Sequence, residues 1–199
     1  MTTWVISRFN HKISWLNDYL KPEDKVVLYD RSENPLFLFD WKHVENKGSD
    51  IYDKFTWIID NYTNLPETSI LLKCNIFDYI KPREFEKIKD NTTFTPILSQ
   101  EHHTYMPVSY YKDGMYYEIN NYWYLNAHPA KYAKEIIEFT GMDRREYNAF
   151  APGSNYIVPK ENILQYSKKI YKKLRSYLDW DVYPGDAQLI ERNLYYLWK

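Results

Sequence analysis

The chain has 199 residues and a formal net charge of −1, from 26 basic and 27 acidic side chains. A balance this close to neutral excludes a global field that would attract nucleic acid or an anionic membrane. The length suits one domain that buries roughly 70% of its unfolded surface. Aromatic residues make up 19% of the chain, including 21 tyrosines, and such rings either fill a core or stack on sugars and bases.

Cysteine usage and hydropathy suggest a compartment. Cys74 is the only cysteine, which excludes an intramolecular disulfide framework and gives no zinc spacing. The first residues lack a signal-peptide pattern, and no apolar run approaches the length of a membrane span. We therefore expect no transmembrane segment and a cytoplasmic protein, or one that acts in the cytoplasm of a host cell.

The first third of the chain predicts strands and helices in the order β-α-β-β-α. The expected strands are 4–6, 26–29 and 36–39, and the expected helices are 13–20 and 51–62. Ser49 is a candidate N-cap for the second helix. A strand, a helix and a second strand within thirty residues form a parallel crossover unit, so we expect a sheet with helices packed on it.

A central strand is expected at 70–72, because this apolar run is too short for a buried helix and Pro66 marks a turn upstream. Asn75 and Asp78 follow it, and Pro82 is well placed to begin a helix that runs to residue 88. Ligands of open α/β sheets bind at the carboxyl ends of the strands. The end of this strand is therefore the expected ligand site.

The pattern changes after residue 91. The expected elements are strands at 93–98, 106–111 and 115–119 with a hairpin turn at 112–114, a helix at 130–139, a strand at 156–158 and a helix at 161–178. Gly141 would close the helix at 130–139, and Asp186 would cap a last helix. The fold class is thus α/β, a mixed sheet flanked by helices with a small antiparallel subregion.

Asp78, with Asn75, is the first candidate for chemistry. A carboxylate just past a central strand can hold Mn²⁺ or Mg²⁺ against a nucleotide diphosphate. The alternative is an Asx turn at the strand-to-helix junction. The Asp-x-Asp sequence at 179–181 follows an amphipathic helix instead of a strand, so we expect a solvated loop there.

Polar side chains also follow the first two expected strands. Arg8 and Asn10 come after the first, and Tyr29 and Asp30 end the second, so both pairs should project from the same sheet edge as Asp78. Arg8 suits a phosphate, and Asp30 suits a base or ribose hydroxyl. Surface ion pairing is the alternative for both.

Three further features lie in the second half. His102 and His103 would point to opposite faces of a strand, so they suit an acceptor sugar better than a shared metal. The basic run 168–175 fits a solvated helix face. Glu191 lies off the apolar stripe of the last helix, where it suits either a salt bridge or a general base for an acceptor hydroxyl.

Several blocks of this sequence resemble an uncharacterised glycosyltransferase-like family found in fungi, bacteria and large viruses. The ending is also similar to capsular-polysaccharide glycosyltransferases of the type A fold. The resembling blocks are 5–10 with Trp15, 26–30, 60–66 with its "NY-x-N-LP" pattern, 75–80 with a "pFDH" turn, 151–158 with a "GAqFaV" strand and 189–198 with an "ERLW" helix.

The resemblance implies one Rossmann-like type A glycosyltransferase domain over residues 1–199. Residues 1–90 would bind a nucleoside-diphosphate sugar, and residues 91–199 would bind the acceptor, a hydroxyl on a glycan or glycoprotein. The motif positions that carry over are Arg8, Asn10, Asn75, Asp78, Gly153, Glu191 and Arg192. Together with the reading above, the assigned residues are Glu191 and Asp78 for catalysis, Asp78 for the metal, Arg8, Asn10, Tyr29, Asp30, Lys73, Asn75 and Arg192 for the donor, and His102, His103, Tyr105, Gly153 and Ser154 for the acceptor.

The sequence departs from the family pattern at three places. His11 stands where an acidic residue is usual, and Tyr79 stands where a histidine is usual. Lys73-Cys74 replaces Gln-Gly, and Lys73 suits the diphosphate charge, which weakens the case for a metal. Two other functions therefore stay open: a non-catalytic carbohydrate-binding module, and a viral structural or assembly protein with a degenerate donor site.

Overall fold

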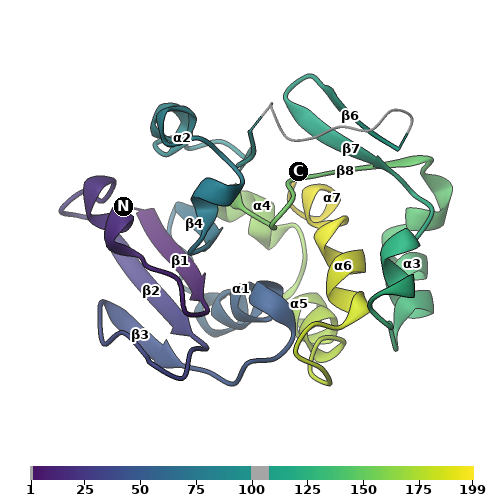
Figure 1. The fold of residues 1–199 in the computed structure, drawn as a ribbon, viewed down its shortest axis with the longest axis horizontal. Helices are drawn as coiled ribbons and strands as arrows, with labels where there is room; N and C mark the ends of the chain where they lie inside the picture. Colours follow the sequence, from purple (N-terminus) through teal and green to yellow (C-terminus); the bar gives the residue numbers. More distant parts are fainter. Residues whose placement is uncertain (1, 100–107) are drawn as a thin grey trace.

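A six-stranded mixed sheet lies at the centre of the fold (Figure 1). The computed structural model of the protein describes residues 2–99 and 108–199. The strand order is β3-β2-β1-β4-β9-β5, with β1 parallel to β2 and β4, and β9 antiparallel to β4 and β5. These strands are β1 (Thr2–Arg8), β2 (Lys25–Asp30), β3 (Asp40–His43), β4 (Thr68–Lys73), β5 (Thr95–Pro96) and β9 (Tyr156–Pro159). The predicted α/β class with a mixed sheet is confirmed.

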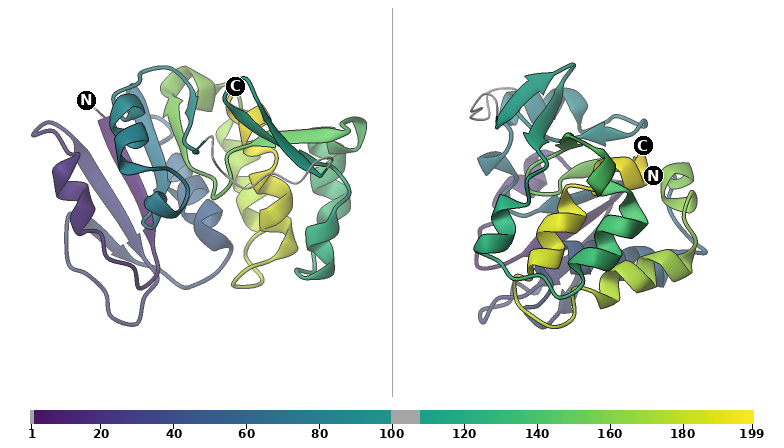
Figure 2. Two further views of the ribbon diagram at one scale, coloured as in Figure 1. Left: turned by 45° about the horizontal axis from the view of Figure 1, so that its top comes forward. Right: turned by 90° about the vertical axis from the view of Figure 1, so that its right-hand side faces the viewer.

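Alternating side chains of the sheet build two cores, one on each face. Val5 and Leu71 face α1, whereas Trp4, Ile6 and Leu72 face α2. The helices on the first face are α1 (Ser49–Asn61), α4 (Lys160–Leu164), α5 (Lys168–Ser176), α6 (Gly185–Glu191) and α7 (Leu194–Trp198), and those on the second are η1 (Ser14–Asp18), η2 (Ile76–Asp78) and α2 (Pro82–Ile88). The sheet is therefore covered on both sides, as the two views of Figure 2 show.

A second, three-stranded antiparallel sheet has the order β6-β7-β8. The predicted hairpin is confirmed, because Lys112 pairs with Met115 and both turn residues, Asp113 and Gly114, have positive φ. The other elements of this region are β6 (Ser109–Lys112), β7 (Met115–Ile119), η3 (Trp123–Asn126), α3 (Ala133–Thr140), η4 (Met142–Arg144) and β8 (Tyr147–Phe150). Strand β8 was not expected from the sequence.

The connection from β1 creates the crevice where the site lies. The chain leaves β1 for β2 and β3 on one side, then returns to place β4 on the other side of β1. Connections that leave in opposite directions open a crevice at the carboxyl ends of the two central strands. Arg8 and Lys73 occupy those two ends.

Two expected elements were wrong. The strand at 36–39 does not form, because the backbone N–H of Leu36 donates to the carboxylate of Asp30 and Phe39 has φ +61°, so pairing with β2 begins only at Asp40. The helix at 161–178 is interrupted between α4 and α5. There the hydroxyls of Tyr62 and Tyr171 donate to backbone carbonyls that a continuous helix would use.

Two further expectations changed in detail. The helix at 13–20 is a five-residue 3₁₀ turn, η1. Asp186 does not cap its own helix. Its buried carboxylate instead accepts the backbone N–H groups of Lys131 and Tyr132, at the start of α3, and the indole N–H of Trp180.

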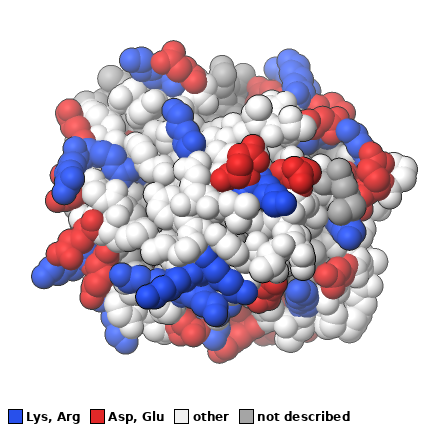
Figure 3. All heavy atoms as spheres, turned by 180° about the vertical axis from the view of Figure 1, so that it is seen from behind, with Lys and Arg blue, Asp and Glu red and all other residues white. Residues whose placement is uncertain are grey.

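The basic run 168–175 forms a solvated helix face, as the sequence pattern predicts. The basic run became α5, whose Tyr171 and Leu174 are buried while Lys172 and Lys173 are exposed. Figure 3 shows one compact patch of Lys and Arg side chains at its lower left, with acidic and basic side chains interspersed over the rest of that face. Within residues 2–99 and 108–199, no helix has the length and apolar character needed to cross a bilayer.

Two buried ion pairs fix the sheet edge. Arg8 donates through Nη1 to both carboxylate oxygens of Asp30, at 2.9 and 2.7 Å. Arg31 forms a two-pronged pair with Asp53 on α1, at 2.8 and 2.6 Å. Because Arg31 follows β2 directly, the second pair ties that strand to α1.

Breaking the first pair should cost stability. Replacing Asp30 by alanine leaves the Arg8 guanidinium buried without its partner, so we expect Asp30→Ala to lower the free energy of unfolding by about 3–5 kcal/mol in urea denaturation. Glu138→Ala is the control, since its pair with Lys134 is exposed at 3.9 Å and should contribute less than about 0.5 kcal/mol. Equal effects of the two substitutions would contradict this assignment.

The pKa of Asp30 predicts how the unfolding free energy depends on pH. Burial by itself raises the pKa of Asp30, but hydrogen bonds from Ser32, Leu36 and Arg8 outweigh it and hold the pKa below its ordinary value of 3.8. A lowered folded-state pKa stabilises the fold above the unfolded-state pKa, and this contribution is lost as the pH falls through the folded-state value. The unfolding free energy should therefore drop on acidification below about pH 4, and more steeply than in Asp30→Ala. Parallel pH curves for the two proteins would contradict this account.

Candidate functional site

A cavity of about 310 Å³ opens at the carboxyl ends of β1 and β4, beside the N-terminus of α1. We call it the edge cavity. Its lining combines polar and cationic groups with aromatic rings: Ser7, Arg8, Phe9, His11, Arg31, Asn46, Ser49, Asp50, Lys73, Cys74, Asn75, Tyr79, Val182 and Tyr183. Its position is the one where α/β sheets bind ligands.

A second cavity of about 220 Å³ adjoins the first. It lies between the central sheet and the small sheet, and we call it the inner cavity. It is lined by Lys73, Tyr79, Tyr116, Glu118, Phe150, Pro152, Gly153, Tyr183, Glu191 and Arg192. Lys73, Tyr79 and Tyr183 line both cavities, so these three side chains stand at the boundary between them.

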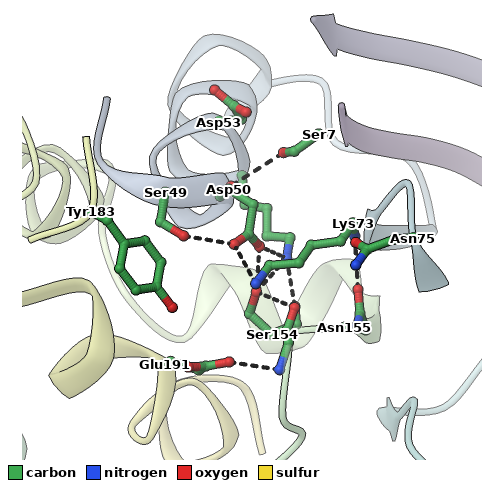
Figure 4. Close-up of polar contacts among 12 residues, drawn as sticks. Ser7, Ser49, Asp50, Asp53, Lys73, Asn75, Ser154, Asn155, Tyr183 and Glu191 are labelled. Carbon is green, nitrogen blue, oxygen red and sulfur yellow. Dashed lines mark hydrogen bonds and ion pairs between the residues drawn. The ribbon is translucent and has the colours of Figure 1, made fainter. Parts of the chain in front are cut away.

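A buried ionic cluster lies at the edge cavity (Figure 4). Asp50, in the first turn of α1, accepts hydrogen bonds from Lys54 Nζ and Ser154 Oγ and, at 2.9 Å, from Ser49 Oγ. Lys73 Nζ lies 3.3 Å from Asp50 Oδ1. Lys54 is fully buried, whereas the Lys73 side chain keeps 21% of its surface exposed. Lys73 is thus the more accessible of the two lysines and the one that a ligand can reach.

The electrostatics of this cluster favour the charged forms of Asp50 and Lys73, whereas burial lowers the pKa of Lys54. Burial by itself would raise the pKa of Asp50, but the charges of Lys54 and Lys73 outweigh it and hold that pKa well below its ordinary value. Burial would likewise lower the pKa of Lys73, but the charges of Asp50 and Glu191 outweigh it and raise that pKa above its ordinary value. Lys73 is therefore an ammonium at neutral pH.

Glu191 reaches the inner cavity from the end of α6. Its Oε1 accepts the backbone N–H of Gly153 at 2.7 Å. Its Oε2 lies 3.9 Å from Arg192 Nη1, while Arg192 Nε donates to Glu118 Oε1 at 2.6 Å. One carboxylate oxygen of Glu191 is thus oriented by the backbone, and the other lies beyond hydrogen-bond distance of Arg192.

The loop 179–184 closes one side of the edge cavity. The backbone N–H groups of Gly48 and Ser49 donate to the carbonyls of Asp181 and Val182, at 2.8 and 3.1 Å. This pairing brings Tyr183 to the boundary between the two cavities. Asp179 and Asp181 are exposed, so the prediction of a solvated loop is confirmed for the Asp-x-Asp sequence.

The structure brings together about half of the residues expected at the site. Arg8, Lys73 and Asn75 line the edge cavity, and Lys73, Gly153, Glu191 and Arg192 line the inner cavity. Arg192 had been expected at the donor, but it lies on the opposite side of the boundary. Ser154 is fully buried beneath the cavities, where it binds Lys54 and Asp50.

The other expected residues that the structure describes do not line either cavity. Asp30 is fully buried, and its oxygens are taken up by Arg8, Ser32 and Leu36. Tyr29 is buried in the core against α1, and Asn10 is exposed. His102, His103 and Tyr105 lie outside the described residues.

The position expected to bind a metal does not fit one. Asp78 is exposed, accepts a hydrogen bond from Asn75 Nδ2 at 2.8 Å and lies outside both cavity linings. This contact joins two side chains, so it is not the Asx turn considered for these residues, in which a side-chain oxygen accepts a backbone N–H. The turn is closed instead by the backbone N–H of Asp78, which donates to the carbonyl of Asn75 at 3.0 Å. Among the described residues, no group of three or more His, Cys, Asp or Glu side chains stands close enough to hold a metal ion.

The sequence reading missed Asp50, Lys54, Arg31 and Tyr183. One signal was available: Lys54 shares the face of α1 that carries Ile51, Phe55 and Ile58, and a lysine inside an apolar stripe needs a buried partner, which Asp50 supplies four residues earlier. No comparable signal marked Tyr183, because its place depends on a loop that folds back to α1.

Comparisons of this chain with protein-family models, with curated proteins and with solved structures find no match.

Gly153 is predicted to be irreplaceable. Its φ is +85°, and an added Cβ would lie 2.6 Å from the Tyr79 ring. Gly141 is a matched control, since its φ is +61° but nothing lies within 4 Å of an added Cβ. We expect Gly141→Ala to cost about 1–2 kcal/mol of backbone strain and Gly153→Ala clearly more in urea denaturation, because the ring must also move. Similar losses would show that the contact with Tyr79 has no energetic weight.

Proposed function

We propose that this protein is a glycosyltransferase that moves a sugar from a nucleoside-diphosphate donor to a hydroxyl group of a glycan or glycoprotein. The observation that carries the proposal is the boundary at Lys73, where an ammonium separates a cavity at the sheet edge from a cavity that contains Glu191. A transferase needs this arrangement: a cation for the departing diphosphate beside a base for the incoming hydroxyl. The sequence blocks that resemble type A glycosyltransferases support the same reaction.

The edge cavity suits the donor because its cations outnumber its carboxylates. Its lining contains the cations Arg8, Arg31 and Lys73 and one carboxylate, Asp50. The N-terminus of the thirteen-residue helix α1 adds a dipole that favours an anion. Lys73 is the most accessible of these cations, so it carries the contact with the diphosphate.

The inner cavity suits the acceptor. Glu191 takes the proton of the acceptor hydroxyl as its oxygen bonds to the anomeric carbon. The bond between that carbon and the diphosphate oxygen breaks, its electron pair stays on the diphosphate, and the charge is stabilised by Lys73. The rings of Tyr116, Phe150 and Tyr183 offer flat apolar faces for a sugar.

Among residues 2–99 and 108–199 no metal site is found, so the proposed steps are written through protein groups alone. The exposed Asp78 carboxylate is turned to Asn75, and Asp50 is saturated by two lysines and two serines. Stabilisation of the diphosphate therefore falls to Lys73 and α1.

A ligand panel tests the proposal. We expect UDP, GDP, CMP or one of their common sugar conjugates to raise the melting temperature without added Mn²⁺, since a ligand at about 100 times its Kd stabilises by roughly 2.7 kcal/mol. A shift that requires Mn²⁺ would contradict the metal-free assignment. No shift with any nucleotide would reject the transferase.

Lys73→Met should weaken nucleotide binding at least about tenfold in a calorimetric titration, because the methionine keeps the chain length and removes the ammonium that pairs with phosphate. Lys134→Met is the matched control, because the Lys134 side chain is 84% exposed on α3. The affinity of this variant for the nucleotide should equal that of the wild type. If both variants bind as tightly as the wild type, the diphosphate is not held by Lys73.

The variant Glu191→Gln distinguishes a loss of sugar transfer from a loss of nucleotide binding. The amide keeps an acceptor oxygen for Gly153 N–H but cannot take a proton, so we expect sugar transfer to fall by about 10²–10⁴-fold while nucleotide affinity stays within about threefold of wild type. Transfer measured with the donor from the panel and a mixture of simple glycans would reveal this split. Full activity in Glu191→Gln would exclude this residue as the base.

The rings of the inner cavity favour one alternative, a non-catalytic carbohydrate-binding module. It predicts glycan binding with no nucleotide affinity, and the same panel distinguishes it from the transferase. The exposed side chains of Phe37, Leu38 and Phe39 beside edge strand β3 are the feature that a structural or assembly protein would use.

A further inference from the structure

The loop 153–155 contacts three separate parts of the site through three consecutive residues. The backbone N–H of Gly153 donates to Glu191 Oε1 at 2.7 Å. The carbonyl and hydroxyl oxygens of Ser154 both accept from Lys54 Nζ at 2.7 Å. The Oδ1 atom of Asn155 accepts the backbone N–H of Lys73 at 2.8 Å. One short loop thus holds both residues of the proposed reaction, Lys73 and Glu191.

The backbone of this loop needs support to hold its shape. Gly153 and Ser154 have φ of +85° and +58°, and the second value is uncommon for a residue with a side chain. Ser154 N–H donates to the carbonyl of Ala151 at 2.9 Å, which tightens the turn. The contacts of Lys54 with Ser154 fix the one strained position that carries a side chain.

Lys54 makes all of its hydrogen bonds to groups inside the protein. Its ammonium has three donors, and they go to Asp50, Ser154 O and Ser154 Oγ. Asp50 in turn lies 3.3 Å from Lys73 Nζ. A buried ion pair is often no more stabilising than apolar residues of the same volume, so stability alone does not account for a lysine in this apolar stripe.

We propose that Lys54 is a positioning residue that, through Ser154 and Asp50, sets the separation between Lys73 and Glu191. The inference rests on the proposed function for its catalytic meaning. Lys54 touches no substrate. It holds the loop 153–155 against α1, so that the group facing the diphosphate and the group facing the acceptor hydroxyl keep one geometry. Small errors in such a geometry slow a transfer reaction strongly, because the reacting atoms must be aligned before bond formation.

The test uses two variants of the full chain. Lys54→Met removes the ammonium, and the double variant Asp50→Asn with Lys54→Met removes the pair as a unit, so that no lone charge stays buried if the single variant folds poorly. Asn61→Ala is the control, because it deletes a side-chain hydrogen bond to Trp57 O at the other end of the same helix.

Amide hydrogen exchange is the first readout and needs no ligand. We expect the amides of Gly153 and Lys73 to exchange at least about tenfold faster in both variants, while Val5 and Leu71 in the central strands keep their wild-type rates, because only the loop contacts are lost. Asn61→Ala should leave the Gly153 and Lys73 amides unchanged. Unchanged exchange at these two amides in the folded variants would overturn the inference.

Kinetics are the second readout, with the nucleotide sugar from the panel as the probe. We expect kcat to fall at least about tenfold in Lys54→Met, which leaves Asp50 and Lys73 in place, while the Kd of the free nucleotide stays within about threefold; this is the split expected when alignment, not binding, is lost. A matched loss of both would overturn the positioning role. If the wild-type protein binds no nucleotide, the proposed function fails, yet amide exchange still decides whether Lys54 fixes the loop.

Discussion

The carboxylate of Asp50 is the group on which the candidate site depends. It stands in the first turn of α1, where it is shielded from water and binds two lysines from different parts of the chain. An ion cluster of this kind is costly unless every member is paired, so its geometry is sharply defined. Through Lys73 it is joined to β4, and through Ser154 to the loop before β9. Helix, strand and loop are therefore fixed relative to one another at the sheet edge.

This ion cluster explains why the charged side chain of Lys73 lines both cavities. Asp50 holds the Lys73 ammonium at the boundary, where part of it stays exposed. The other cations of the edge cavity, Arg8 and Arg31, are engaged with Asp30 and Asp53 and shape its walls. A ligand with two phosphate groups would find a preformed electrostatic site here, with little reorganisation required on binding.

The inner cavity differs in chemical character. It offers a carboxylate oriented by a backbone N–H, a buried Arg192–Glu118 pair and several aromatic rings. These features suit a neutral, hydroxyl-rich group more than a second anion. In the proposed transfer reaction, the edge cavity is assigned to the charged diphosphate and the inner cavity to the polar acceptor.

The sequence was sufficient for the elements whose apolar period is clear. Strands β1, β2, β4 and β9 and helix α1 follow from short apolar runs and one amphipathic stripe, and a cavity lies at the carboxyl end of β4, where a ligand site was expected. It was insufficient where a distant partner overrides the local pattern. The carboxylate of Asp30 accepts the backbone N–H of Leu36, so the strand expected at 36–39 does not form. The carboxylate of Asp186 binds the start of α3 instead of capping its own helix.

The same reason limits what could be foreseen of the site. Arg8 and Asp30 were expected to face a ligand separately, but they bind each other. They lie side by side at the ends of two neighbouring strands, and a buried charge is costly unless an opposite charge pairs with it. Lys54 and Ser154 are a hundred residues apart, so only the folded chain reveals their contact. The spacing of Asp50 and Lys54 on α1 was the one local sign of a buried pair.

The most direct test of the account is a map of amide chemical shifts as the protein is titrated with a nucleoside diphosphate, UDP first and then GDP. The account predicts changes concentrated at Ser7, Ser49, Lys73 and Asn75 around the edge cavity, with smaller changes at Gly153. Changes at the opposite, amino end of the strands, near Thr3 and Glu67, or no changes with either nucleotide, would contradict it.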